Sequence, residues 1–230
     1  MKITYIGHSG FAVEYQDVAF IFDYYKGKLP ELKKARKVYV FASHNHFDHF
    51  TEEIFSWVSD YPEITYILSD DIEADGPADH VKKIGSDQMM DVDDIHIKTL
   101  RSTDEGVAFF LSVNGKKIFH AGDLNWWHWE EEGPLYNQFM KKNFLRAIEK
   151  IKGEHIDAAF FPVDPRLNDA YYWGIDWFMR ETDTEVVFPM HMQNEQKRLY
   201  VKLMEEPKTK PYRHKIIQIE KEGQIFRIES

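Results

Sequence analysis

Short strands dominate the hydrophobic pattern of the first half of the chain. Apolar, β-branched and aromatic residues either alternate with polar ones or form short continuous runs, which are the patterns of half-buried and buried strands. On this basis we expect strands at residues 3–6, 11–15, 18–23, 38–42, 64–69 and 95–100. Asn114-Gly115 is a favoured two-residue turn, so a hairpin is predicted between residues 106–113 and 117–121.

Helices and strands alternate in the second half. Amphipathic spacing predicts helices at 53–60, 136–151, 171–179 and 194–206. Apolar runs predict further strands at 157–164, 186–191, 214–219 and 224–228. The polar stretch 70–88 is expected to be a loop with at most one helical turn. This order of elements favours two packed sheets with helices outside, in one domain that spans residues 1–230.

The stretch that follows the buried strand at 38–42 carries the strongest chemical signal. It places His44, His46, Asp48 and His49 within six residues. Side chains two apart in an extended segment share a face, so His44 and His46 can chelate one cation. Asp48 and His49 come where the chain turns toward a helix that Thr51 is suited to cap. The alternative is a solvated polar loop that happens to be rich in histidine, but four ligand residues at this spacing favour a metal site.

Other polar residues stand at the ends of apolar strands. His8 lies in a glycine-flanked turn and Asp23 ends the strand predicted at 18–23. Either residue alone is usually a surface or structural polar group. Together, just before a metal-binding stretch, they are candidates to orient the ligating imidazoles by hydrogen bonding. Asp164 and His191 end two of the later strands in the same way.

Composition excludes several function classes. Lys and Arg number 29 and Asp and Glu 39, so the formal net charge is −10, which opposes docking on nucleic acid or on an anionic membrane. Without cysteine there is neither a disulfide framework nor a thiolate metal site. The start of the chain has no signal-peptide pattern, and no apolar run approaches the ~20 residues that span a bilayer. We therefore expect a cytoplasmic protein with a small-molecule substrate; an oligomer remains open.

The motifs resemble those of the metallo-β-lactamase superfamily. The His44–His49 stretch matches its His-x-His-x-Asp-His signature, and His120-Ala121-Gly122-Asp123 is similar to the Gly-Asp motif that carries its bridging carboxylate. Pro189-Met190-His191 resembles its final histidine. The opening Gly7-His8-Ser9 and the Phe22-Asp23 strand end resemble the small bacterial metal-dependent hydrolases related to ascorbate-6-phosphate lactonase. The resemblance spans residues 7–191 and implies a four-layer αββα sandwich of two mixed β-sheets flanked by helices.

The resemblance also implies a dinuclear metal site with assigned ligands. Two divalent ions are expected, zinc first with manganese or iron as alternatives, held by His44, His46, Asp48, His49, Asp123 and His191, while His8, Asp23 and His120 orient them. The family usually adds a third histidine to the first ion, from the strand end before the hairpin. Asp104 stands there instead, either as a substitute ligand or as a residue of a turn beside Gly106.

The implied reaction is hydrolysis of an ester, a lactone or a phosphodiester by a metal-activated water. Asp48 would orient the nucleophile or accept its proton. Residues expected around the substrate are Trp126, Trp127, His128 as a general acid, Asp164 and Arg166, although a surface arginine often has no such role. The alternatives are a mononuclear or non-catalytic metal-binding relative and, more distantly, a nuclease, for which the chain shows no basic face.

Overall fold

The structure is a computed structural model that describes residues 1–32, 34–74 and 76–228. The chain divides into two compact units, Met1–Gly85 with Glu220–Ser230, and Ser86–Ile219. Each unit is built on its own mixed β-sheet. The C-terminal segment joins the first unit because β15 pairs with β1 and the terminal amine of Met1 donates to the Ile228 carbonyl at 2.8 Å.

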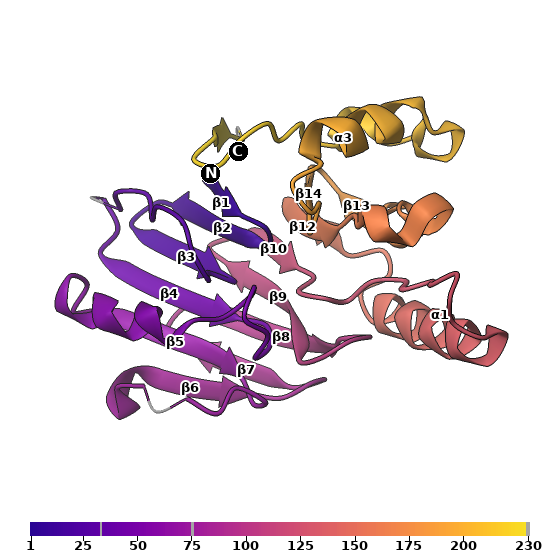
Figure 1. Ribbon diagram of the computed structural model, residues 1–230. Helices are drawn as coiled ribbons and strands as arrows, with labels where there is room; N and C mark the ends of the chain where they lie inside the picture. Colours follow the sequence, from indigo (N-terminus) through magenta and orange to yellow (C-terminus); the bar gives the residue numbers. More distant parts are fainter. Residues whose placement is uncertain (33, 75, 229–230) are drawn as a thin grey trace. The chain divides into compact units, whose positions relative to one another are not determined.

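In the first unit, the described residues form a seven-stranded sheet in the order β15-β1-β2-β3-β4-β5-β6 (Figure 1). The strands are β1 Lys2–Gly7, β2 Gly10–Tyr15, β3 Val18–Phe22, β4 Lys37–Ala42, β5 Ile64–Ser69, β6 Val81–Ile84 and β15 Ile225–Arg227. Two 3₁₀ helices accompany them, η1 Glu52–Ser59 and η2 Ala78–His80. Pairing is antiparallel from β15 to β3 and parallel from β3 to β6. Side chains on both faces of β4 are buried, which explains its continuous apolar sequence.

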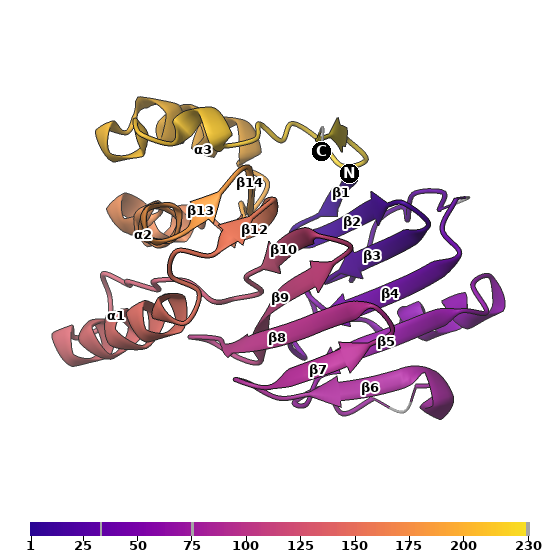
Figure 2. The ribbon, with the colours of Figure 1, turned by 180° about the vertical axis from the view of Figure 1, so that it is seen from behind.

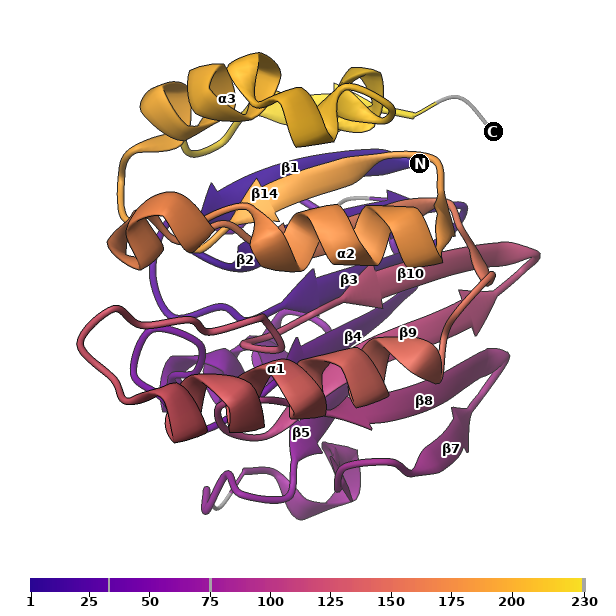
Figure 3. The ribbon, with the colours of Figure 1, turned by 90° about the vertical axis from the view of Figure 1, so that its right-hand side faces the viewer.

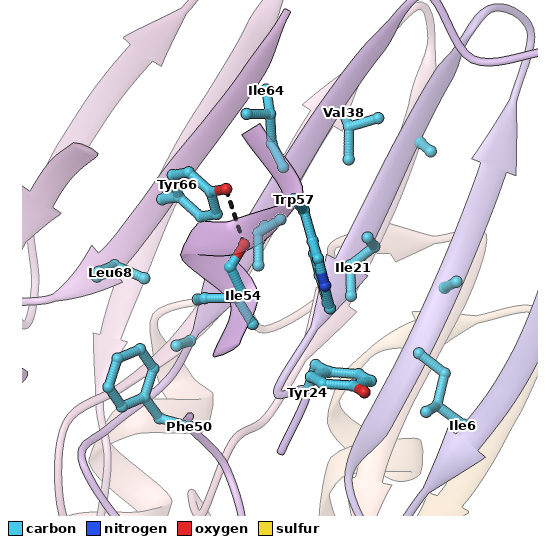
Figure 4. Packing of buried hydrophobic residues seen from close by; sticks show 14 of the residues in the cluster. Ile6, Ile21, Tyr24, Val38, Phe50, Ile54, Trp57, Ile64, Tyr66 and Leu68 are labelled. Atoms are coloured by element: carbon cyan, nitrogen blue, oxygen red, sulfur yellow. Dashed lines mark hydrogen bonds between the residues drawn. The ribbon is translucent and has the colours of Figure 1, made fainter. Parts of the chain in front are cut away.

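One face of this sheet is covered by η1. Figure 4 shows Ile54 and Trp57 of η1 lying over Ile21, Val38 and Ile64 of the strands. Thr51 caps η1 by accepting from the Glu53 N–H, as the sequence predicts, although the helix is 3₁₀ rather than α. The helix is also held to the sheet from within the core, because Tyr66 Oη donates to the Ile54 carbonyl at 2.8 Å.

In the second unit, the described residues form a six-stranded sheet in the order β14-β12-β10-β9-β8-β7 (Figure 2). Its strands are β7 Met89–Val92, β8 Ile95–Arg101, β9 Val107–Val113, β10 Lys116–His120, β12 Ala158–Pro162 and β14 Val187–Met190; a separate short pair is β11 His155–Ile156 with β13 Asp183–Thr184. β14, β12 and β10 are parallel, whereas β10, β9, β8 and β7 are antiparallel. The β9–β10 turn is Asn114-Gly115, both at positive φ, so the hairpin predicted at 106–121 is confirmed.

Helices pack on this second sheet. They are α1 Pro134–Glu149, α2 Trp173–Glu181 and α3 Gln196–Glu205, with the 3₁₀ helices η3 Pro165–Ala170, η4 Pro207–Thr209 and η5 Arg213–Lys215. α1 and α2 run side by side (Figure 3). Phe144 of α1 contacts Phe161, and Phe178 of α2 stacks on both Phe161 and Phe119. Among the helices of the described ranges, none is long and apolar enough to cross a membrane.

The expected α/β class with two mixed sheets is confirmed, but two local predictions are wrong. The stretch 70–88, expected to be a loop, contains β6; its position 75 lies outside the described residues. β6 is a four-residue edge strand whose Lys82 and Lys83 are exposed. Charged residues on an edge strand prevent pairing with other chains, but they also replace the apolar residues by which a strand is recognised in the sequence. Residues 214–219 do not form a strand: Ile216 makes an isolated bridge to Val187, and β15 pairs with β1 instead.

We expect Tyr66→Phe to lower the free energy of unfolding by about 1–3 kcal/mol, because the Ile54 carbonyl would lose its donor inside the core. Burial raises the pKa of Tyr66 from 10.0 to about 12. The folded state therefore binds the hydroxyl proton of Tyr66 more tightly than the unfolded state does. The contribution of Tyr66 to the free energy of unfolding is complete below pH 10 and is lost as pH rises toward 12. Urea unfolding of both proteins should show their difference narrowing above pH 10; a constant difference would contradict this assignment.

Candidate metal centre

The first group of predicted ligands lies at the carboxyl ends of β3 and β4. These strands are parallel and in register from Val18 opposite Lys37 to Phe22 opposite Phe41, so they end side by side. Asp23 follows β3 directly, and Ser43 and His44 follow β4. The carboxyl ends of parallel strands, where the chain leaves the sheet, are the usual position for a site in such folds.

The buried carboxylate of Asp23 organises this end of the sheet. It has no exposed surface and accepts from the Ser43 N–H at 2.8 Å, from the Ser43 hydroxyl at 2.7 Å and from His49 Nδ1 at 2.7 Å. Three donors compensate its charge inside the protein, as a buried carboxylate requires. Because Nδ1 of His49 donates to Asp23, Nε2 is the ring atom suited to bind a cation.

The serine hydroxyl also determines the tautomer of His44. Its single proton goes to Asp23, so the Ser43 oxygen accepts from His44 Nδ1, 2.9 Å away. The lone pair of His44 is therefore on Nε2, which lies 3.0 Å from Nδ1 of His46. Two nitrogen ligands of one tetrahedral zinc ion are about 3.3 Å apart, given Zn–N bonds of about 2.0–2.1 Å. The two imidazoles are thus already spaced as neighbours in one coordination sphere.

Asp48 and His8 lie beside this set. The turn that carries Asp48 closes through the His46 carbonyl, which accepts from the N–H groups of His49 and Phe50 at 3.0 Å each. His8 Nε2 lies 3.4 Å from Asp48 Oδ2, and the His8 ring contacts the His49 ring edge-on at 5.3 Å. The first unit therefore gathers four imidazoles and two carboxylates, those of Asp23 and Asp48, at one end of its sheet.

The second group of predicted ligands repeats this arrangement in the other unit. β10, β12 and β14 are parallel neighbours, and each is followed by a polar residue at its carboxyl end: Asp123, Asp164 and His191. His191 Nδ1 lies 2.8 Å from Asp164 Oδ2, and its Nε2 lies 3.6 Å from Asp123 Oδ1. Nε2 of His191 and the carboxylate of Asp123 thus face the same space as potential ligands.

Asp164 is placed differently from its expected position around a substrate. It is fully buried, and its carboxylate accepts from His191 Nδ1 and from the N–H, Nε and Nη2 groups of Arg166. Burial by itself raises the pKa of Asp164, but the hydrogen bonds from His191 and Arg166 outweigh it and lower the pKa to about 2. Asp164 is therefore an ionised acceptor that holds His191, and Arg166 is committed to Asp164.

Backbone strain gathers at the same residues. His8, Asp23 and His191 all have positive φ, at 50°, 42° and 60°, and Gly122 beside Asp123 has a φ of 51°. A residue with a side chain in this region costs about 1–3 kcal/mol and persists only where the surroundings impose it. Hydrogen bonds hold Asp23 and His191 in this conformation. The conformation in turn sets the direction of their side chains at the strand ends.

The remaining predicted residues occupy varied environments. Asp104 is exposed, and its N–H donates to Ser102 Oγ at 3.2 Å. His120 is buried, and its Nδ1 accepts from the Gly122 N–H at 3.2 Å, which supports the turn before Asp123. Trp127 is buried, and its indole N–H donates to the Asp123 carbonyl at 2.8 Å.

Two supporting residues escaped the sequence analysis. Ser43 connects Asp23 to His44, and its only sequence signal is its position directly before the first ligand. Thr103 is buried, and its hydroxyl donates to the Asn125 carbonyl at 2.7 Å and accepts from the Asn125 N–H at 3.0 Å. It thereby fixes the loop that follows Asp123, at a place where a serine or threonine has no distinctive pattern.

Residues 2–133, more than half of the chain, match the Beta-lactamase superfamily domain. The chain belongs to this superfamily, and the resemblance drawn from its motifs is confirmed.

Individual proteins resemble this chain in sequence or in structure. The chain is 29% identical to a UPF0173 metal-dependent hydrolase of Alkaliphilus metalliredigens (strain QYMF) over 140 residues, which cover 54% of this chain and 63% of that relative, less than two thirds of its length. Igni18, a metallo hydrolase from Ignicoccus hospitalis KIN4/I, has a similar structure, with a TM-score of 0.68 and 18% identity over 99% of both chains. An isothiocyanate hydrolase from Delia radicum gut bacteria matches with a TM-score of 0.62 and 15% identity over the whole of both chains. At these identities the two structures show the fold alone.

We expect Asp23→Asn to lower the free energy of unfolding of the metal-free protein by about 2–4 kcal/mol. A neutral amide cannot accept from all three donors, and its own NH₂ group would face one of them. Urea unfolding in the presence of a chelator measures this without a contribution from bound metal. Asp17→Asn, at an exposed turn between β2 and β3, is the matched control and should change stability by less than about 0.5 kcal/mol. Equal effects of the two substitutions would refute the role given to Asp23.

Proposed function

We propose that this protein is a metal-dependent hydrolase whose predicted histidine and aspartate ligands hold two divalent ions. The observation that carries the proposal is the repeated hydrogen bond from a histidine Nδ1 to a fully buried carboxylate, Asp23 with His49 and Asp164 with His191. A metal-ligating imidazole almost always donates its other ring N–H to such an acceptor, which fixes its tautomer and its orientation. The superfamily membership and the names of the relatives support the same function.

The donor chemistry fits such ions. His44 and His46 would hold the first ion, and Asp48, His49 and His191 the second, with Asp123 between them. The set is made of nitrogen and oxygen without sulfur, which suits zinc and also manganese or iron. His8 and Asp23 would hold the ligands of the first unit in place, and His120 would support Asp123.

The chemistry follows from these groups. When bound, a pair of divalent ions lowers the pKa of a water and neutralises the charge that develops on a substrate oxygen. A carboxylate oxygen of Asp48 would accept the proton of the attacking water, and His8, 3.4 Å away, would keep that carboxylate in position. The proposed substrate is a small ester, lactone or phosphodiester. His128, half-buried on the loop after Asp123, is the proposed proton donor to the leaving group.

Metal content tests the dinuclear site. We expect close to two ions per chain in wild-type protein prepared without chelator, and a clear loss in Asp123→Ala, because the carboxylate proposed to lie between the ions would be gone. Asp104→Ala separates the two roles of that exposed residue: a lower content would make Asp104 the substitute ligand, and an unchanged content would leave it in its turn. About one ion in the wild type would favour a mononuclear relative instead. The metal found would then be used to screen lactones and phosphodiesters.

Metal affinity tests the role of Asp164. We expect Asp164→Asn to weaken metal binding about 10- to 100-fold, since it removes the ionised acceptor that orients His191. Asp169→Asn, on the exposed side of η3, should leave the affinity unchanged. Competition with a chromophoric chelator measures both. If the two variants bind metal equally well, Asp164 does not act through His191.

A further inference from the structure

A pocket with aromatic walls lies in the second unit, between the loop that follows Asp123 and the start of α1. Its volume is about 570 Å³, and its aromatic walls are Trp126, His128, Trp129 and Trp173. The ring centroids of Trp126 and Trp173 are 5.5 Å apart, and those of His128 and Trp173 are 4.8 Å apart. None of these contacts is needed to position the proposed metal ligands.

Hydrogen bonds and ring stacking fix the rim of the pocket. Asn137 of α1 is buried, and its side chain pairs with the backbone of Trp129 in both directions: Oδ1 accepts from the N–H at 3.0 Å and Nδ2 donates to the carbonyl at 2.7 Å. Trp129 in turn stacks on the buried Trp127 with centroids 5.9 Å apart and nearly parallel planes. The walls are therefore held before any ligand arrives, which lowers the entropic cost of binding.

The charges around the pocket favour a cation. Glu130 and Glu132 contribute two carboxylates to the lining, against the ammonium of Lys141. The Arg166 guanidinium lies over the Trp129 ring, 5.5 Å from its centroid, but its charge is already paired with Asp164. That ammonium lies over the Trp126 ring, 5.0 Å from its centroid. An indole face is the best aromatic surface for a cation, and acidic groups nearby strengthen the attraction. The protein thus already places a positive group of its own against the wall of this pocket.

We propose that this pocket binds an organic cation, an alkylammonium group, and that Lys141 occupies the Trp126 face until the ligand displaces it. Lys141 is exposed, and its ammonium is carried on a flexible four-carbon side chain, so it can leave the ring. The inference does not depend on the proposed hydrolase activity, because binding can be measured on metal-free protein. An aromatic carboxylate paired with Lys141 is the competing ligand chemistry, and it makes the opposite prediction for a Lys141 variant.

Tetramethylammonium chloride is the probe, titrated into the whole chain at constant ionic strength and followed by calorimetry and by tryptophan fluorescence. Lys141→Gln should bind it at least threefold more tightly, because the internal competitor is gone. Trp126→Leu should bind it at least tenfold more weakly, a loss of about 1.4 kcal/mol. Glu132→Gln, an exposed change that leaves the walls intact, should weaken binding two- to threefold. Lys142→Gln, the exposed neighbour that is not part of the lining, should bind like the wild type.

Three results would overturn the proposal. One is an absence of tetramethylammonium binding to both the wild type and Lys141→Gln. Another is weaker binding by Lys141→Gln than by the wild type. The third is saturable binding of benzoate that Lys141→Gln abolishes, which would assign the pocket to an aromatic anion. The melting temperature of each variant shows whether its fold is intact, and Glu132→Gln tests the charge even if Trp126→Leu does not fold.

Discussion

Among the residues that the structure describes, a hydrogen bond from histidine Nδ1 to a fully buried carboxylate is made twice, and each group of candidate ligands depends on one of these bonds. Asp23 lies 2.7 Å from His49, and Asp164 lies 2.8 Å from His191. A carboxylate without exposed surface is tolerated only where donors surround it, and here the imidazole is one of those donors. The same contact therefore offsets the cost of burying the charge and orients the ligand. Asp23 and His191 both have a positive φ, which is a strained conformation, and this contact holds them in it.

Parallel strands make this arrangement available. β3 and β4 end together in one unit, and β10, β12 and β14 end together in the other, so residues far apart in the sequence become neighbours at a sheet edge. The strands before these ends are apolar and buried, which keeps the edge rigid. The antiparallel strands carry fewer of the predicted site residues: His8 lies in the turn between β1 and β2, and Asp104 lies in the turn between β8 and β9.

The sequence is informative where chemistry is local and less so where it depends on strand neighbours. The ligand spacing from His44 to His49 is visible in six consecutive residues, and Asp23 stands out at the end of an apolar run. The partner of Asp164, His191, is not visible, because no pattern tells which strand lies next to β12. The sequence alone therefore places this carboxylate among the substrate-pocket candidates. Two wrong predictions, the loop expected where β6 lies and the strand expected at 214–219, have the same cause. Whether a segment forms a strand depends on a pairing partner that the local sequence does not specify.

The proposed dinuclear centre is tested most directly by a crystal structure of the metal-loaded protein with anomalous scattering. We expect two anomalous peaks: one bound by His44 and His46, the other by Asp48, His49 and His191, with Asp123 contacting both. A single peak, or peaks that none of these residues contacts, would contradict the proposal.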